Sequence, residues 1–293
     1  VGSGHGVGVS FGAATHRAGQ PMGQPGHPRA HERLVLPGNQ RLRAFDFGRG
    51  TTRVHLKQGF DAASIRTEVA VRGGGRQGPF PQITRSDPEG TWFEEPIVQG
   101  FVLSRCPPWK PRARYEAEGL RLLEEWLTAS EKTADVAPYV ASVHARFAEL
   151  CDAFAERYPD EPRALGRAGE VLAARANTLD KLTLAHSHGD FQPGNLLVEQ
   201  RTDRVFLTDW EYSARRSRRF DHLVHELRLR SAVGLATRVR SYGGDRAEGA
   251  LALLEELVRL LEENLSGCYI APSVAYRCMT RELPGVIEEL GTS

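Results

Sequence analysis

The chain has 293 residues, of which 40% are hydrophobic and 26% charged, and its formal net charge is +1. This balance is typical of a soluble globular protein and gives no global field that would attract nucleic acid or an anionic membrane. No apolar run approaches the roughly 20 residues that span a bilayer, and no charged segment followed by an apolar one suggests a leader, so we expect a cytoplasmic protein with room for two lobes.

The first 30 residues differ in composition from those that follow. They are rich in Gly, Pro and His and contain few large apolar side chains. Such a segment cannot bury enough surface to offset the entropy of ordering its chain. We expect residues 1–30 to form a disordered tail, and the spacing of its histidines fits no compact set of metal ligands.

Residues 31–105 alternate between short apolar runs and turns. Strand-like patterns bounded by Gly, Pro or Asn cover residues 34–36, 41–47, 52–58, 82–85 and 91–95. Between the third and the fourth of these, residues 61–72 lack Pro and Gly and have apolar side chains at helical spacing. These patterns predict a small N-terminal lobe with a five-stranded antiparallel sheet and one helix.

The rest of the chain, residues 106–293, is expected to be mostly helical. It begins with a rigid Cys-Pro-Pro-Trp segment, after which helical patterns cover residues 120–127, 136–154, 162–179, 248–265 and 273–290. Such apolar stripes usually mean core packing, and we assign them no chemistry. The sequence therefore predicts an α+β protein with a second, larger and mostly helical lobe.

Residues 186–211 form the most informative stretch of the chain. A polar loop carries His188 and Asp190, and Asn195 lies five positions after Asp190. Asp209 lies at the end of a later strand. Phosphoryl transfer needs a carboxylate beside the attacking hydroxyl and hard oxygen ligands for Mg²⁺ on the nucleotide phosphates. Asp190 can serve as the first, and Asn195 and Asp209 as the second. A solvated turn rich in Asp and Asn is the alternative, but four matched positions at fixed spacing favour the chemical role.

The pattern H-x-D-x-x-x-x-N followed by a strand-borne Asp is that of the catalytic core of protein kinases. Three departures are Gly189 after the His, Pro-Gly before the Asn, and Asp-Trp-Glu at 209–211. They resemble the aminoglycoside phosphotransferase and choline kinase family, whose members phosphorylate small molecules. The following segment, with Phe220-Asp221, is similar to the choline and ethanolamine kinase form. The resemblance spans roughly residues 33–221, and only the central stretch is specific.

The resemblance implies a two-lobed protein kinase-like fold and a kinase that uses ATP and Mg²⁺. The nucleotide would bind in the N-terminal lobe, and the γ-phosphate would pass to a hydroxyl of an aminoglycoside, an amino alcohol, a sugar or a similar acceptor in the helical lobe. Asp190 would orient the hydroxyl and accept its proton, His188 would organise the loop, and Asp221 would accept hydrogen bonds from the loop backbone. Residues 96–100 would form the hinge that binds adenine.

A lysine and a glutamate of the N-terminal lobe complete the expected nucleotide site. Val-His-Leu-Lys at 54–57 has the shape of the Val-Ala-Ile-Lys strand of kinases, so Lys57 is the candidate for the α and β phosphates. Kinases orient that lysine with a Glu from the following helix, and Glu68 lies on the predicted helix. An exposed strand lysine and a solvated Glu68 are the alternative, and Glu94 or Glu95 could be the partner instead.

The loop Pro37-Gly38-Asn39-Gln40 would cover the phosphates. It contains one glycine and not the three of the G-x-G-x-x-G pattern. Gly38 and Asn39 can still present backbone amides to a phosphate if Gly38 permits close approach. A plain hairpin turn between two strands is the alternative.

The contacts to the acceptor stay open. Trp210, Glu211 and Tyr212 follow the metal Asp, and aromatic faces with a carboxylate could hold a protonated or quaternary amine. Trp210 could equally be packing. The arginine cluster within residues 215–219 has two interpretations. If it borders the acceptor site, it favours a phosphorylated or carboxylated acceptor. The alternative is an exposed basic loop with no role in binding.

Two other functions compete with a small-molecule kinase. A nucleotide-binding pseudokinase or scaffold would explain the poor glycine loop, although it has no need of Asp190, Asn195 and Asp209 together. A protein kinase should carry Asp-Phe-Gly and a recognisable activation segment, and the sequence has neither.

Overall fold

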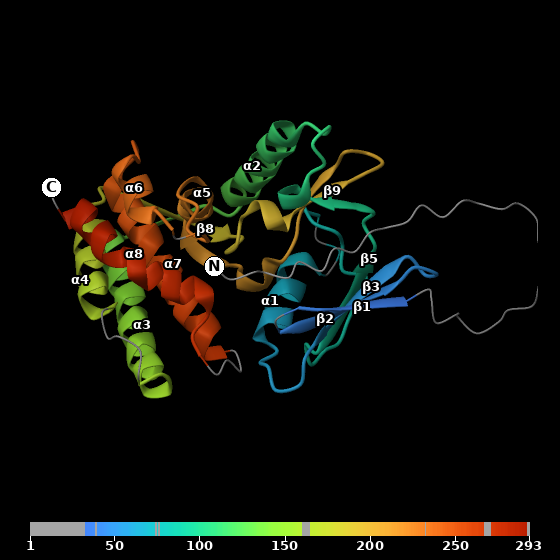
Figure 1. Ribbon diagram of the computed structural model, residues 1–293, viewed down its shortest axis with the longest axis horizontal. Coiled ribbons are helices and arrows are strands. Elements are labelled where there is room, and N and C mark those ends of the chain that lie inside the picture. The colour runs from blue at the N-terminus through green and yellow to red at the C-terminus, as the bar shows by residue number, and fades with distance from the viewer. Residues whose placement is uncertain are drawn as a thin grey trace, which may run out of the picture.

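The computed structural model describes residues 33–38, 40–73, 75, 77–159, 165–231, 233–266 and 271–291. The expected tail over residues 1–30 and the loop residue Asn39 lie outside the described residues. Figure 1 shows the sheet of the first part of the chain and the helices of the last part at opposite ends of the molecule.

The N-terminal lobe contains, within the described residues, a five-stranded antiparallel sheet in the order β1-β2-β3-β5-β4. Its elements are β1 (Arg33–Pro37), β2 (Arg41–Asp46), β3 (Thr51–Leu56), α1 (Ala63–Arg72), β4 (Arg85–Ser86) and β5 (Trp92–Pro96). The helix α1 packs on β3 and β5 through Ile65, Val54 and Phe93, which are all buried. The sheet and its single helix confirm the prediction for this lobe.

A second core joins this sheet to the helices. It contains side chains of α1, α2 (Arg112–Thr128), β8 (Leu182–Ser187), β9 (Leu196–Glu199) and β10 (Val205–Leu207). Two small antiparallel sheets, β10-β9-β6 and β11-β8-β7, add β6 (Gly100–Val102), β7 (Lys132–Ala134) and β11 (Ala214–Ser217). Single 3-10 turns cover Leu103–Arg105, Pro193–Asn195 and Trp210–Tyr212. The polar loops that follow β8 and β10 therefore start from the middle of the molecule.

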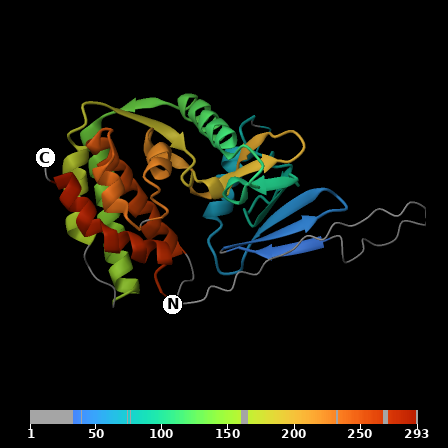
Figure 2. The same ribbon diagram turned by 45° about the horizontal axis from the view of Figure 1, so that its top comes forward.

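The helical lobe is organised around α7 (Arg246–Ser266), whose apolar side chains are almost all buried. Against it pack α3 (Val136–Arg157), α4 (Leu165–Ala176), α5 (Phe220–Glu226) and α8 (Val274–Gly291), and α6 (Leu235–Arg240) packs against α8. Figure 2 shows these helices side by side at the end of the molecule away from the sheet. Among the described residues, no helix has the length and apolarity that crossing a bilayer requires.

The boundary between the lobes, expected after residue 105, stays a prediction. The second core draws on both sides of it, because Val71 and Phe80 precede the boundary and Tyr115 and Trp210 follow it.

The arginine cluster does not form the exposed loop that was one of its expected forms. Ala214–Ser217 is a strand that pairs with β8, and Arg216 donates from its side chain to the carbonyl oxygen of Tyr212 at 2.8 Å. The side chains at 215, 218 and 219 likewise bind a protein carbonyl or carboxylates. Because these guanidinium groups are held within the protein, the cluster stabilises the strand and gives no support to an anion site.

Candidate active site

The loop after β8 takes its path from one buried carboxylate. Asp221, in the first turn of α5, accepts the backbone N–H of His188 at 2.7 Å and that of Gly189 at 2.9 Å. Gly189 has a φ of +85°, and a Cβ at this position would lie 2.1 Å from the carbonyl oxygen of Tyr212. Only glycine fits there. The expected hydrogen bonds between Asp221 and the loop backbone are confirmed.

The His188 ring links this loop to the loop that follows β10. The ring is buried, its Nε2 lies 2.9 Å from the carbonyl oxygen of Thr208, and its Nδ1 accepts the backbone N–H of Asp190 at 3.2 Å. A ring nitrogen that faces a carbonyl oxygen carries the proton, so the contacts assign the neutral Nε2–H tautomer. His188 is therefore placed to hold the backbone at Asp190 and the backbone before Asp209.

Asp190, Asn195 and Asp209 come together at the junction of the two loops. The Asn195 side-chain amide donates to the backbone carbonyl and to the carboxylate of Asp190, both at 2.8 Å. The backbone carbonyl of Asn195 accepts the N–H of Thr208 at 2.9 Å, which brings the neighbouring Asp209 to the same place. Asp209 has a φ of +68°, a conformation that is uncommon outside glycine and is concentrated at functional sites.

Glu68 of α1 also reaches this region, but without the expected lysine. The residue is 1% exposed, and its two carboxylate oxygens bind Arg41 at 2.5 Å and the guanidinium of Arg72. Lys57 donates from Nζ to the carbonyl oxygen of Gly38 at 2.6 Å. The predicted pair of Lys57 and Glu68 is therefore wrong, and Glu68 binds Arg41 of the sheet and Arg72 of its own helix instead.

The alternation of side chains along the strands explains why Arg41, and not Lys57, meets Glu68. Leu56, the last residue of β3, packs in the core beneath α1, so the next side chain, Lys57, points to the opposite face. The register of β2 with β3 places Arg41 directly across from Leu56. The alternative partners for the lysine, Glu94 and Glu95, also bind arginines.

Arg41 lies at the centre of an acidic cluster. It is 5% exposed, and its guanidinium lies 2.9 Å from Glu211 and 3.6 Å from Asp209. Arg43, two residues further along β2, lies 3.2 Å from the same Asp209 carboxylate. Burial would lower the pKa of Arg41, but the charges of Glu68, Glu211 and Asp209 raise it above its ordinary value.

Burial affects the ionisation of the acids in this cluster. Burial raises the pKa of Asp209, Arg43 opposes this rise, and the charges of Glu68 and Asp190 add to it. Burial also raises the pKa of Glu211 to about 8, with a contribution from Asp209. A cation bound beside Asp209 and Glu211 would favour their ionised forms.

A cavity of about 250 Å³ lies beside the loop between β1 and β2. Its lining residues are Gly38, Gln40, Arg41, Arg43, Asp209, Glu211 and Tyr212. In the part of the chain that the structure describes, no three His, Cys, Asp or Glu side chains form a group that could hold a metal. Asp209 and the amide oxygen of Asn195 would supply only two hard ligands, which suits a Mg²⁺ ion that is completed by water and nucleotide phosphates.

Trp210 does not contact this cavity. It is 0% exposed, donates from its indole N–H to a backbone carbonyl at 2.9 Å, and packs edge-on against Phe80 and Trp126. The tentative assignment of Trp210 to the acceptor is therefore wrong, because its ring belongs to the second core. Glu211 and Tyr212, by contrast, do line the cavity.

Sequence reasoning missed two side chains that hold Asp190. Gln192 donates to both carboxylate oxygens at 3.1 and 3.2 Å, and the Nε of Arg230 lies 3.0 Å from one of them. Arg230 also lies 2.7 Å from Glu256, a buried carboxylate of α7 that Arg259 shares at 3.0 Å. Charged residues inside an apolar helix were the signal that could have revealed this network.

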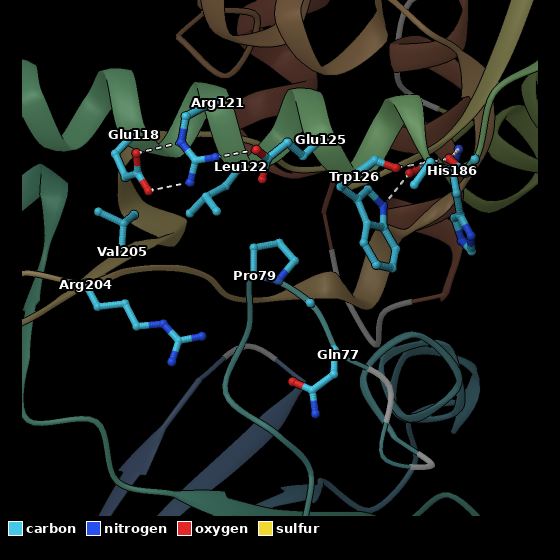
Figure 3. Close-up of a pocket in the computed structure, with 13 residues that line it drawn as sticks. Gln77, Pro79, Glu118, Arg121, Leu122, Glu125, Trp126, His186, Arg204 and Val205 are labelled. Atoms are coloured by element: carbon cyan, nitrogen blue, oxygen red, sulfur yellow. Dashed lines mark hydrogen bonds and ion pairs between the residues drawn. The ribbon is translucent and has the colours of Figure 1, made fainter.

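Another cavity, of about 530 Å³, lies between α2 and the loop at residues 77–79. Figure 3 shows Arg121 held between Glu118 and Glu125 on one wall, with Arg204 on the facing wall. None of the predicted catalytic or metal residues lines it. Both acids of this wall bind Arg121, and we assign the cavity no part in the chemistry.

No protein-family model matches the chain, and no curated protein matches it. Several solved structures do. A choline/ethanolamine kinase family protein from Mesorhizobium loti has a TM-score of 0.53 and 14% identity, over 89% of this chain and 88% of that one. A thermostable mutant of the aminoglycoside phosphotransferase APH(4)-Ia, in ternary complex with AMP-PNP and hygromycin B, has a TM-score of 0.57 and 12% identity, over 89% and 95%. An ethanolamine kinase from Plasmodium vivax has a TM-score of 0.52 and 11% identity, over 87% and 82%.

These similarities confirm the two-lobed protein kinase-like fold that was predicted. At identities of 11 to 14%, the fold is what the chains share.

Asp221→Ala should lower the free energy of unfolding by roughly 2–6 kcal/mol, because two buried N–H groups lose their acceptor. Urea denaturation of the purified variant measures this change. Asp152→Ala, at an exposed position on α3, is the matched control and should leave the free energy unchanged. Equal losses in the two variants would show that Asp221 does not hold the loop.

The raised pKa of Glu211 predicts that stability depends on pH. The folded protein keeps this proton up to a pH of about 8, whereas the unfolded chain releases it near the ordinary pKa of a glutamate. The contribution of Glu211 is therefore present below the ordinary pKa and is lost as the pH rises through about 8. Glu211→Gln, which cannot ionise, should gain stability relative to the wild type as the pH rises. Urea unfolding of both proteins across that range tests this, and a difference that is independent of pH would contradict the assignment.

Proposed function

We propose that the chain is an ATP-dependent phosphotransferase that moves the γ-phosphate to a hydroxyl of a small molecule in the presence of Mg²⁺. The observation that carries the proposal is the meeting of Asp190, Asn195 and Asp209, the last of which lines a cavity together with Arg41 and Arg43. The fold that the chain shares with choline/ethanolamine kinase and aminoglycoside phosphotransferase structures supports it.

Asp190 orients the acceptor hydroxyl and accepts its proton. Hydrogen bonds from Gln192 and Asn195 and the ion pair with Arg230 fix the direction of its carboxylate. The transition state of phosphoryl transfer is loose, and positioning supplies most of the rate. A carboxylate that is held in place is therefore sufficient, and no strong base is required.

Asn195 and Asp209 hold Mg²⁺. Because the amide nitrogen of Asn195 faces Asp190, its amide oxygen is the atom left for a cation. The ion would neutralise charge on the phosphate oxygens. It would also favour the ionised forms of Asp209 and Glu211, whose pKa values are raised by burial and, to a lesser extent, by neighbouring acids.

Arg41 binds the nucleotide phosphates in place of Lys57. Glu68 orients the guanidinium, and Arg41 lines the cavity together with Arg43. A guanidinium can bind phosphate oxygens through two parallel hydrogen bonds. Lys57 instead holds the carbonyl of Gly38 and so steadies the loop that borders the cavity.

One contact favours a second candidate, a nucleotide-binding protein without transfer activity. Arg43 lies 3.2 Å from the carboxylate of Asp209, the residue that should bind the metal. In an enzyme this arginine must turn from Asp209 to the phosphates when nucleotide and metal bind, and its side chain is 42% exposed, which leaves room for that motion. A scaffold has no such requirement.

Asp190→Ala should lower turnover by roughly 10²- to 10⁴-fold with nucleotide affinity little changed, because the carboxylate acts on the acceptor and not on ATP. The assay is ADP formation from Mg-ATP over aminoglycosides, amino alcohols, sugars and nucleosides, paired with equilibrium binding of a fluorescent ATP analogue. Asp152→Ala is the control. Mg-dependent nucleotide binding by the wild type, without transfer to any acceptor, would favour the scaffold.

Arg41→Gln should raise the KM for ATP by about 10- to 100-fold, because a charge-assisted contact to phosphate is lost. Lys57→Gln should change this KM much less. Arg41→Lys, which keeps the charge, should recover part of the affinity, and thermal unfolding of each variant shows whether the fold is intact. A KM that responds to Lys57→Gln and not to Arg41→Gln would restore the lysine to the phosphate site.

A further inference from the structure

A cavity of about 680 Å³ lies beside the loop after β8, outside the proposed nucleotide site. Its walls come from the start of α2, the loop after β8, the end of α5 and the residues that follow α5. Gln192 and Arg230 line it, and both contact the Asp190 carboxylate, at 3.1 Å and 3.0 Å. It shares no lining residue with the cavity at Arg41. Its volume lies within the range of small-molecule sites, about 300–1,000 Å³.

The acids that line this cavity already have partners. Glu116 lies 3.2 Å from the Nε2 of His225, and Glu226 lies 3.3 Å from Arg219. Arg219 offsets the charge of Glu226, but burial lowers the pKa of His225, so its ring does not offset the charge of Glu116. Glu116 is therefore the one acid of the lining whose charge no cation within hydrogen-bond distance compensates, among the residues that the structure describes.

Two arginines that line the same cavity have no ion-pair partner among the described residues. Arg112, in the first turn of α2, and Arg228, two residues after α5, are both exposed, and no ion pair or hydrogen bond engages either guanidinium within the described residues. Burial lowers the pKa of Arg238, and the charge of Arg228 lowers it further, as expected where positive charge is not neutralised. The N-terminus of α2 adds the positive end of a helix dipole beside Arg112.

We propose that this cavity receives the acceptor and selects a hydroxyl compound that carries a phosphate or carboxylate group. Arg112 and Arg228 hold the anionic group, since each guanidinium can bind two of its oxygens, while the hydroxyl lies at Asp190. The inference rests on the proposed function and names the substrate class of that site. An amino alcohol or an aminoglycoside would bring positive charge to two guanidinium groups that lack a counter-ion, and would bind less well.

The transfer step needs no further reactant. The acceptor oxygen forms the new bond to the γ-phosphorus, and the bond between that phosphorus and the oxygen that bridges it to ADP breaks. The electron pair of the broken bond leaves with ADP, and the hydroxyl proton passes to the carboxylate of Asp190. Arg230, which lines the cavity and is held at 2.7 Å by Glu256, contacts that carboxylate at 3.0 Å.

The test compares acceptors that are matched except for charge. Ribose 5-phosphate is set against ribose, glycerate is set against glycerol, and ethanolamine is the cationic acceptor, with ADP formation from Mg-ATP as the readout. We expect kcat/KM to be higher by about tenfold or more for the anionic member of a pair, because its anionic group gains a charged hydrogen bond that the neutral acceptor lacks. The phosphate arm and the carboxylate arm show which anion the cavity takes.

The double variant Arg112→Gln with Arg228→Gln should lower kcat/KM for the anionic acceptor by about 10- to 100-fold and leave the KM for ATP unchanged. Arg114→Gln is the matched control, because this arginine is exposed on the same helix and does not line the cavity. Calorimetric binding of ribose 5-phosphate and of glycerate, with AMP-PNP and Mg²⁺ present, gives a second readout.

Faster transfer to ribose, glycerol or ethanolamine would overturn the inference, and so would an unaltered kcat/KM for the anionic acceptor in the double variant. The absence of both transfer and binding for ribose 5-phosphate and glycerate would also overturn it. If AMP-PNP binds normally in that case, the proposed nucleotide site is unaffected. If AMP-PNP does not bind, the proposed function fails, and the inference fails with it.

Discussion

Two hydrogen bonds to the carboxylate of Asp221 hold the loop on which the candidate site is built. Backbone N–H groups that leave a strand for a buried loop must find acceptors, and here one side chain of α5 supplies both. Gly189 permits the close approach to the next loop, and the His188 ring then ties the two loops together. The position of Asp190 therefore depends on a helix that follows it by some thirty residues along the chain.

Each lobe supplies arginines that pair with the acids of the site. On the helical side, Arg230 connects Asp190 to a buried glutamate of α7. On the side of the sheet, Arg41 and its neighbour on β2 face Asp209 and Glu211. Each lobe thus contributes cations to a common group of acids, but the pKa of Glu211 still rises to about 8. A cation bound beside Asp209 would favour the ionised forms of these carboxyl groups.

The guanidinium of Arg41 suits this position better than an ammonium would. Its planar fork contacts Glu68 on one edge and Glu211 on another, at 2.5 and 2.9 Å, whereas a lysine is a point charge on a flexible stem. The similarity of residues 54–57 to the Val-Ala-Ile-Lys strand of kinases predicted that Lys57 binds the nucleotide phosphates. The alternation of side chains along β3 was the better guide, since it directs Leu56 and not Lys57 toward α1.

The sequence by itself determined the sheet with its single helix, the helical second part and the spacing of Asp190, Asn195 and Asp209. These features follow from periodicity and from short distances along one loop, which neighbouring residues encode. Tertiary structure alone decided that Arg41 meets Glu68, that Arg230 meets Asp190, and that Trp210 is core. Those contacts join residues that are 27 or more positions apart, or depend on which side of a strand or turn faces the interior. Strand register and helix packing set them, and no local pattern of residue types records either one.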